Sequence, residues 1–295
     1  MATEQPRTLT GEPGGLATLA RAALPAVPGL NRLPGIRKGP ARDFTGLSYA
    51  REAVVVERSR VDAYAGVCGF PRRDVVPVSF PHLLAFPLHM AIMGDPAFPY
   101  AAIGMVHVEN TITARRAIGI GEALDVTTSV AAPRPHARGV LLDFTTTVAA
   151  DGETAWESTS TYLRRGRSVD GAPTPGLTLP DPPTGGVEWR LPADLGRTYA
   201  AVSGDANPIH LHPLTAKALG FPRQIAHGMW TLARSVAAIE NRLPEAVTVE
   251  VAFKKPVLLP GTVRYAARHD DAGWSFAMAN PKDGSPHLLG RADPA

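Results

Sequence analysis

The chain has 295 residues, of which 44% are hydrophobic and 19% are charged, and its formal net charge is +3. This composition is typical of a folded protein with a sizeable core. The small net charge and the lack of a Lys/Arg cluster argue against nucleic-acid binding. A single cysteine, Cys68, excludes an internal disulfide and a cysteine metal cluster, and it indicates a reducing, cytoplasmic compartment.

The first 44 residues predict an N-terminal arm rather than a signal peptide. The stretch from Leu16 to Leu30 is broken by one arginine and two prolines, so no continuous apolar core follows the first charges. We expect at most one short helix here, around residues 15–24. No window of the chain reaches the roughly 18 apolar residues that a membrane span needs, so we expect no membrane partner.

Two pairs of similar segments predict that the chain consists of two related halves. Residues 64–70 (Tyr-Ala-Gly-Val-Cys-Gly-Phe) resemble residues 199–205 (Tyr-Ala-Ala-Val-Ser-Gly-Asp), and residues 112–124 resemble residues 251–263. The two pairs occur in the same order and at nearly the same separation, which favours a common ancestor over two generic strand-and-turn patterns.

A proline-rich segment between the halves predicts a surface linker. The chain is therefore divided into an arm (1–44), a degenerate N-terminal domain (45–165), a linker (166–186) and a catalytic C-terminal domain (187–295).

The hydrophobic pattern within each half predicts helix followed by strands. Strands are expected at 140–150, 158–164, 247–254, 261–268, 274–279 and 287–292, and helices at 213–220 and 229–240. Strands gathered around one long helix, twice over, predict an α+β fold in which two antiparallel sheets each wrap around a helix.

The segment from Tyr199 to His210 is the strongest functional signal. It places Asp205, Asn207 and His210 on a predicted loop, behind a glycine and around a proline. A carboxylate and an imidazole beside one water can orient it and exchange its protons, and a carboxamide can fix its orientation. For Asp205 or Asn207 alone, the alternative is an ordinary helix cap or turn.

Gly228 stands at the start of the predicted helix 229–240. The first N–H groups of a helix lack internal partners, the helix dipole favours negative charge there, and glycine permits close approach of a ligand. Gly228 is therefore a candidate oxyanion donor, with an ordinary helix-start glycine as the alternative. His227 is either a polar contact to the substrate or a buried, hydrogen-bonded histidine.

These residues carry a family resemblance. The motifs Tyr-x-x-x-Ser-Gly-Asp-x-Asn-Pro-Ile-His (199–210), Ala-His-Gly-Met (226–229) and Val-x-Phe-Lys-Lys-Pro-Val (251–257) resemble the hydratase-2 signature of MaoC-like dehydratases. The whole chain is similar to the two-domain, double hot-dog type of that family. The resemblance implies a lyase of fatty-acyl metabolism that reversibly hydrates trans-2-enoyl thioesters to (R)-3-hydroxyacyl thioesters.

The resemblance also implies roles for residues and partners. Asp205 and His210 would hold and activate the water, Asn207 would support them, and the Gly228 N–H would bind the thioester oxygen. The substrate would be an acyl-CoA or acyl-carrier-protein thioester, without cofactor or metal, and the chain is a possible homodimer. Lys254 and Lys255 would meet the CoA phosphates or an acidic carrier, unless they form only a solvated face.

The N-terminal copy departs from this pattern. Phe70 replaces the aspartate, and residues 71–75 contain no Asn-Pro and no histidine. The counterpart of His-Gly-Met is expected at residues 86–88, where Pro87 has no N–H to donate. The bulky run 80–93 is expected to shape an acyl tunnel, with core packing as the alternative.

Three other functions fit the sequence less well. A thioesterase would also use an acid and a helix-start N–H, but the paired Asp205 and His210 favour a hydratase. A non-catalytic acyl-binding subunit fits the first half better than the second. A dinucleotide-binding enzyme has little support, because Gly119-Ile-Gly121 lacks the third glycine of the phosphate-binding motif.

Overall fold

The computed structural model describes residues 5–9 and 44–295, which form two compact units. The short helix expected around residues 15–24 lies outside the described residues. Unit 1 contains residues up to 55, 82–107 and 123–175, and unit 2 contains residues 56–81, 108–122 and 176–295. The units do not follow chain order, because two segments of the N-terminal half belong to the same unit as the C-terminal half.

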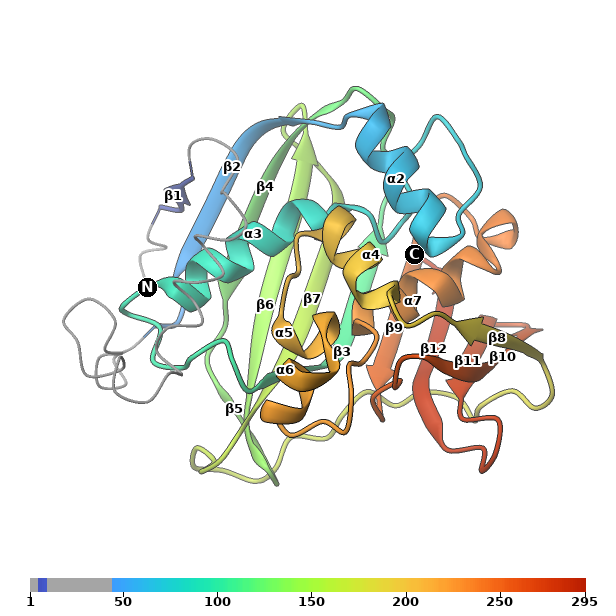
Figure 1. The fold of residues 1–295 in the computed structure, drawn as a ribbon. Coiled ribbons are helices and arrows are strands. Elements are labelled where there is room, and N and C mark those ends of the chain that lie inside the picture. Colours follow the sequence, from blue (N-terminus) through green and yellow to red (C-terminus); the bar gives the residue numbers. More distant parts are fainter. Residues whose placement is uncertain (1–4, 10–43) are drawn as a thin grey trace. The chain divides into compact units, whose positions relative to one another are not determined.

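The sheet of unit 1 has the strand order β1-β2-β4-β6-β7, and β5 pairs with β6. These strands are Arg7–Thr8 (β1), Ser48–Val55 (β2), Ala123–Val130 (β4), Arg134–His136 (β5), Gly139–Ala150 (β6) and Glu153–Arg165 (β7). All pairs are antiparallel except β1 with β2, which is parallel. The long helix α3 (Pro81–Gly94) crosses one face of this sheet (Figure 1).

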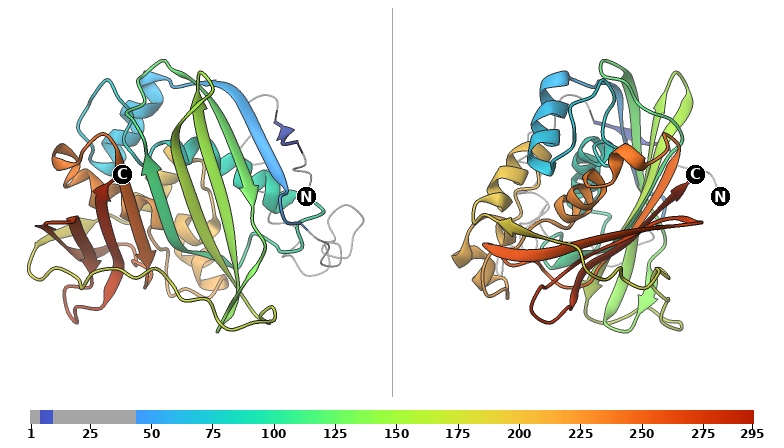
Figure 2. Two further views of the ribbon diagram at one scale, coloured as in Figure 1. Left: turned by 180° about the vertical axis from the view of Figure 1, so that it is seen from behind. Right: turned by 90° about the vertical axis from the view of Figure 1, so that its right-hand side faces the viewer.

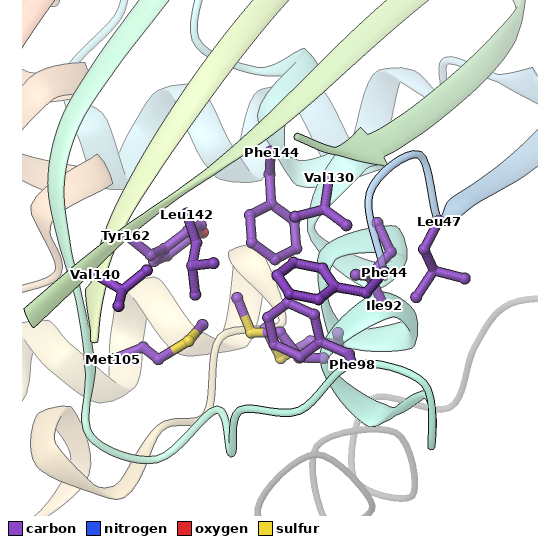
Figure 3. Close-up of a cluster of buried hydrophobic side chains, with 12 residues drawn as sticks. Phe44, Leu47, Ile92, Phe98, Met105, Val130, Val140, Leu142, Phe144 and Tyr162 are labelled. Atoms are coloured by element: carbon purple, nitrogen blue, oxygen red, sulfur yellow. The ribbon is translucent and has the colours of Figure 1, made fainter. Parts of the chain in front are cut away.

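Alternation along β6 explains how this helix is held. Phe144 and Val148 are buried, whereas Thr145 between them is exposed. Leu142 and Phe144 belong to one apolar cluster with Ile92 and Met93 of α3 (Figure 3). Burying each such side chain contributes about 1.5–3 kcal/mol, so the cluster fixes α3 on the sheet.

The sheet of unit 2 is antiparallel and has the order β3-β9-β12-β11-β10-β8. Its strands are Met105–Ala114 (β3), Val187–Leu191 (β8), Val247–Phe253 (β9), Gly261–Asp270 (β10), Gly273–Ala279 (β11) and Pro286–Pro294 (β12). The four C-terminal strands therefore lie where the alternation predicts them. In the β3–β9 pair, Thr111 lies opposite Glu250, its counterpart in the sequence repeat.

The helices of unit 2 gather on one side of its strands (Figure 2). They are Arg58–Cys68 (α2), Leu195–Ser203 (α4), Pro208–Leu211 (α5), Pro213–Ala218 (α6), Gly228–Ala237 (α7) and the 3₁₀ turn Glu240–Arg242 (η3). Helix α7 packs on β11, and its Leu232 and Val236 are fully buried. The indole N–H of Trp230 donates to the carbonyl of Val67 at 3.1 Å, which ties α2 to α7.

The repeated segments 64–70 and 199–205 correspond to the ends of two helices, α2 and α4, which have the same geometry. Helix α2 ends at Gly69 with φ 80°, and α4 ends at Gly204 with φ 77°, both in the left-handed region that glycine adopts without strain. The two helices pack against each other. The residue that follows each glycine therefore starts a loop in the same local geometry, and that residue is Phe70 in one copy and Asp205 in the other.

The segments that lead into α3 and α7 are also held in the same way. The backbone N–H of Val76 donates to the carbonyl of Ile118 at 2.9 Å, and that of Ala226 donates to the carbonyl of Val257 at 2.9 Å. In both copies this bond lies just before the long helix, so Val76 and Ala226 are equivalent positions.

This equivalence corrects one alignment made from the sequence. Counting on from Val76, the counterpart of Gly228 is Val78, whereas residues 86–88 lie inside α3 with Pro87 in the helix interior. The sequence concealed the helix start because the run 80–93 is apolar throughout. The N-terminal copy therefore has an N–H at the glycine position, and the absence of its chemistry rests on Phe70 and on the missing histidine.

Among the residues that the structure describes, no helix combines the length and the apolar character that a membrane crossing requires.

Candidate active site

The loop that follows α4 carries the predicted acid and base, and Asn207 shapes its second half. The side-chain oxygen of Asn207 accepts the backbone N–H of Ile209 at 3.3 Å and so caps α5. Pro208 fills the first helical position, where a missing N–H costs nothing. The capping role that the sequence left open is thus observed, and the NH₂ group of Asn207 is left as a donor for a ligand.

His210, in the short helix α5, is buried and keeps one ring nitrogen as an acceptor. Its side chain is 7% exposed, and its Nδ1 lies 2.8 Å from the carbonyl oxygen of Ile225. A carbonyl only accepts, so Nδ1 carries the proton and the lone pair is on Nε2. Burial, and then the neighbouring His227, lower the pKa of His210 to about 3, against the opposing effect of Asp205. The ring is therefore neutral at pH 7.

A glycine in α4 allows His210 to sit where it does. A Cβ added at Gly196 would lie 2.0 Å from the carbonyl oxygen of His210, far inside van der Waals contact. Only glycine permits this close approach of helix and loop. The sequence offered one sign of it, since a glycine inside a helix costs about 1 kcal/mol and usually has a packing reason.

Asp205 presents one carboxylate oxygen to the site. Its Oδ1 accepts the backbone N–H of Asn207 at 3.1 Å, which orients the carboxylate, and the side chain keeps 26% exposure. Burial raises the pKa of the Asp205 carboxyl above its ordinary value, while His210 and the Asn207 N–H partly oppose that rise. Desolvation of this kind makes a carboxylate a better proton acceptor.

His227 is buried behind this pair rather than open to a ligand. Its side chain is 2% exposed, and its Nε2 lies 2.9 Å from the backbone carbonyl oxygen of Asp205, so Nε2 carries the proton. Its ring stacks on that of His210, with 3.6 Å between centroids and 24° between planes. Burial lowers the pKa of His227 to about 4, so this ring is also neutral at pH 7.

The three side chains do not suit a shared metal ion. One potential ligand atom from each of Asp205, His210 and His227 falls within a 4.8 Å group. However, an imidazole binds a metal through a lone pair in the plane of its ring, and these two rings are stacked. One ion cannot lie close to both planes at bonding distance, so the cluster suits proton transfer better than coordination.

Gly228 begins α7 and leaves its N–H available. This N–H makes no hydrogen bond within the described residues, and it lies at the positive end of the helix dipole. A Cβ added at Gly228 would meet the ring of Phe253 at 3.3–3.4 Å. The ring of Phe253 thus lies against Gly228 on one side. The strand pattern around Phe253 does not predict this contact.

Lys254 and Lys255 follow directly after β9, and their side chains are exposed. Their backbone is fixed by His287, whose carbonyl accepts the Lys254 N–H and whose Nδ1 bonds the Lys255 carbonyl. Neither lysine forms a salt bridge with a described residue, and neither is brought into contact with the acid–base pair.

The family of the chain follows from comparison with known proteins. A model described as "MaoC like domain" matches residues 178–281, the part that carries this site. The 3-hydroxyacyl-thioester dehydratase X of Mycobacterium tuberculosis is 39% identical over 283 residues, covering 94% of this chain and 97% of that protein. The chain belongs to the MaoC-like dehydratase family.

Solved structures of this family confirm the fold. The crystal structure of HtdX from M. tuberculosis is 37% identical, has a TM-score of 0.75, and is matched over 84% of this chain and 100% of that chain. A MaoC-like dehydratase from Phytophthora capsici is 18% identical with a TM-score of 0.69, over 84% of this chain and 95% of that chain. The α+β double hot-dog fold predicted from the sequence is therefore confirmed.

Proposed function

We propose that this member of the MaoC-like dehydratase family catalyses the reversible hydration of trans-2-enoyl thioesters to (R)-3-hydroxyacyl thioesters. The observation that carries the proposal is the pairing of the Asp205 carboxylate with the unprotonated Nε2 of His210, on a loop that leads to the Gly228 N–H. The name of the M. tuberculosis relative, a 3-hydroxyacyl-thioester dehydratase, supports the same chemistry.

Asp205 and His210 both accept hydrogen bonds from one water molecule, and each has a different role in activating it. Water donates one hydrogen bond to the Asp205 carboxylate and one to His210 Nε2, so that its oxygen lone pair faces C3 of the enoyl group. Burial raises the pKa of Asp205 and lowers that of His210 to about 3, so Asp205 is the stronger proton acceptor. Asp205 therefore takes the proton, and His210 orients the water.

The hydration step then balances as follows. The water oxygen bonds to C3, its proton passes to Asp205, and the π electrons of the C2–C3 bond move into the thioester carbonyl as an enolate. The Gly228 N–H stabilises the enolate oxygen. Asp205 returns the proton to C2, which gives syn addition from one face, and dehydration is the reverse sequence.

The carrier of the acyl group is part of the proposal. A CoA or acyl-carrier-protein thioester supplies the activated carbonyl, and the exposed Lys254 and Lys255 are candidates to meet its phosphates or acidic groups. Only the thioester and its α,β carbons take part in the chemistry described above.

The proposal is tested with a panel of trans-2-enoyl-CoA substrates of increasing length, following the loss of enoyl absorbance and the configuration of the product. Asp205→Asn and His210→Gln are each expected to lower kcat by roughly 10²–10⁴, the usual contribution of a positioned acid or base. His212→Gln is the control, because His212 caps α6 and is exposed on the same stretch of chain.

Two outcomes would contradict the proposal. Near-native hydration by either variant would remove the assigned acid–base pair. Release of free CoA thiol from the wild type, without any hydrated product, would identify a thioesterase instead.

A further inference from the structure

We propose that His227 is a positioning residue that holds the acid and the base of the site in one geometry without touching the substrate. The inference rests on the proposed hydration chemistry and deepens it. It assigns the arrangement of Asp205 and His210 to a single short segment, residues 225–228, in front of α7.

The first contact fixes the acid. The Nε2–H of His227 donates to the backbone carbonyl of Asp205 at 2.9 Å, a bond between residues far apart in the chain. Asp205 follows the left-handed Gly204, at a point where the backbone has no helical bonds to restrain it. This hydrogen bond therefore sets where the Asp205 carboxylate points.

The second contact fixes the base. The imidazole of His227 lies flat on that of His210 at 3.6 Å, and the ring of Tyr199 packs against His227 at 4.9 Å. His210 is also held by the carbonyl of Ile225, two residues before His227. The segment 225–228 thus restrains the His210 ring at Nδ1, through the Ile225 carbonyl, and on one face, through the ring of His227.

The segment itself is anchored to the sheet side of the unit. The Ala226 N–H donates to the carbonyl of Val257 at 2.9 Å, and Ile225 forms an isolated antiparallel bridge with Leu258. One anchored stretch therefore restrains His210 through Ile225, restrains Asp205 through His227, and presents the Gly228 N–H. A rigid support of this kind keeps reacting groups aligned, and misplacement by about 1 Å can cost 10²-fold in rate.

Two other roles for His227 fit the contacts less well. A substrate contact is disfavoured because the side chain is 2% exposed, with one ring face on His210 and Tyr199 packed against it. Simple packing is disfavoured because its Nδ1 is buried and finds no hydrogen-bond partner among the described residues. Phenylalanine would fill the same space without burying an unsatisfied nitrogen.

Two variants separate the two contacts. His227→Phe keeps a stacking ring but loses the donor to Asp205, and His227→Gln keeps a donor but loses the ring. For His227→Phe we expect kcat to fall by about 10- to 100-fold, with KM within about threefold of the wild type and an unchanged melting temperature. His227→Gln should recover part of the lost kcat. His269→Phe, on β10 with its ring against Trp274, is the matched control and should leave kcat unchanged.

Each result either supports or overturns the assignment. A raised KM with unchanged kcat would make His227 a substrate contact, and a lower melting temperature with unchanged kcat in both variants would make it structural only. If neither variant folds, ¹⁵N NMR of the wild-type histidines decides. His227 protonated on Nε2 and His210 on Nδ1 supports the inference, and the opposite tautomer of either overturns it.

The test also distinguishes this inference from the function on which it rests. If Asp205→Asn is inactive while both His227 variants keep the wild-type kcat, only the positioning role is wrong. If Asp205→Asn retains activity, the proposed chemistry is wrong regardless of His227.

Discussion

The two copies of the repeat differ most at the residue after their shared helix ending. In the first copy this residue is Phe70, which is 7% exposed and stacks on Tyr64 with 6.1 Å between ring centroids. In the second copy it is Asp205, whose side chain keeps 26% exposure and faces His210. The same backbone geometry therefore supports a core contact in one place and a candidate acid in the other.

The loops that follow differ in length as well. Residues 69–80 join α2 to α3, whereas residues 204–227 join α4 to α7 and include the short helices α5 and α6. His210 belongs to that extra sequence, so the first copy has no position for it. The proposed chemistry therefore depends on the longer loop, while the first copy contributes α2 as a support for α7.

Placing the residue of the first copy at the oxyanion position should have the largest effect. Gly228→Val introduces the counterpart residue Val78, and its Cβ would press on the ring of Phe253 at 3.3–3.4 Å. Valine keeps the backbone N–H, so the effect comes from its side chain, which would shift the start of α7 and block the close approach of the thioester oxygen. We expect kcat to fall by about 10²-fold, near the lower end of the 10²–10³ that one oxyanion contact contributes. Steady-state kinetics would show it, with Val78→Gly as the control that changes kcat little. A Gly228→Val enzyme with native kcat would contradict the assignment of this N–H.

The buried histidines of unit 1 should affect stability instead of turnover. His82 is 5% exposed, and burial lowers its pKa to about 4. An unfolded histidine binds its proton near pH 6.5, so this contribution to stability is complete above pH 6.5 and is lost as the pH falls toward 4. When the pH falls from 7 to 5, the free energy of unfolding of the wild type should therefore decrease by about 2 kcal/mol more than that of His82→Phe. Urea unfolding at both pH values measures this, and equal losses would contradict it.

A smaller effect on turnover is expected at Gly196, where α4 comes close to the backbone of His210. The counterpart of Gly196 in the first copy is Val61 of α2. The first copy has no loop equivalent to the one that carries His210. Gly196→Ala improves helix propensity by about 1 kcal/mol, yet its Cβ would collide with the His210 carbonyl oxygen. We expect kcat to fall by about tenfold or more through displacement of His210. Native kcat together with a higher melting temperature would show that the loop adjusts freely.

The smallest expected effect concerns the contribution of the first copy to acyl-chain preference. Most apolar residues of α3, such as Leu84 and Leu88, are fully buried in the core, but Phe86 is only partly buried. The sequence predicts that the bulky run 80–93 shapes an acyl tunnel, and in that case Phe86→Ala should move the preferred substrate of the enoyl-CoA panel to longer chains. Each methylene buried is expected to contribute up to about 0.8 kcal/mol, or about fourfold in kcat/KM. A profile that is flat beyond roughly four carbons would leave the first copy as a scaffold only.

Local patterns predicted much of this molecule. The alternation predicted β6 and β10, and the contiguous motif from Tyr199 to His210 identified the family, because each depends on neighbours in the chain. The features that were missed depend on residues far apart in sequence. Gly196 against His210, Phe253 against Gly228 and the stack of His227 on His210 arise only when α4, β9 and α7 are packed.

The misplaced helix start has a physical cause too. Inside an apolar run, Pro87 resembles a helix boundary, but α3 continues through it. The helix starts at Pro81, a few residues after the hydrogen bond from Val76 to Ile118, and no sequence pattern reports that bond.

The central claim is that one chain holds one working site, in the copy that carries Asp205. Isothermal titration with a tight-binding, non-reactive analogue of a 3-hydroxyacyl thioester tests it most directly. We expect one molecule bound per chain, and we expect both this binding and turnover to be lost when Asp205→Phe gives the second copy the residue of the first. Two equivalent sites per chain, or native turnover by Asp205→Phe, would contradict it.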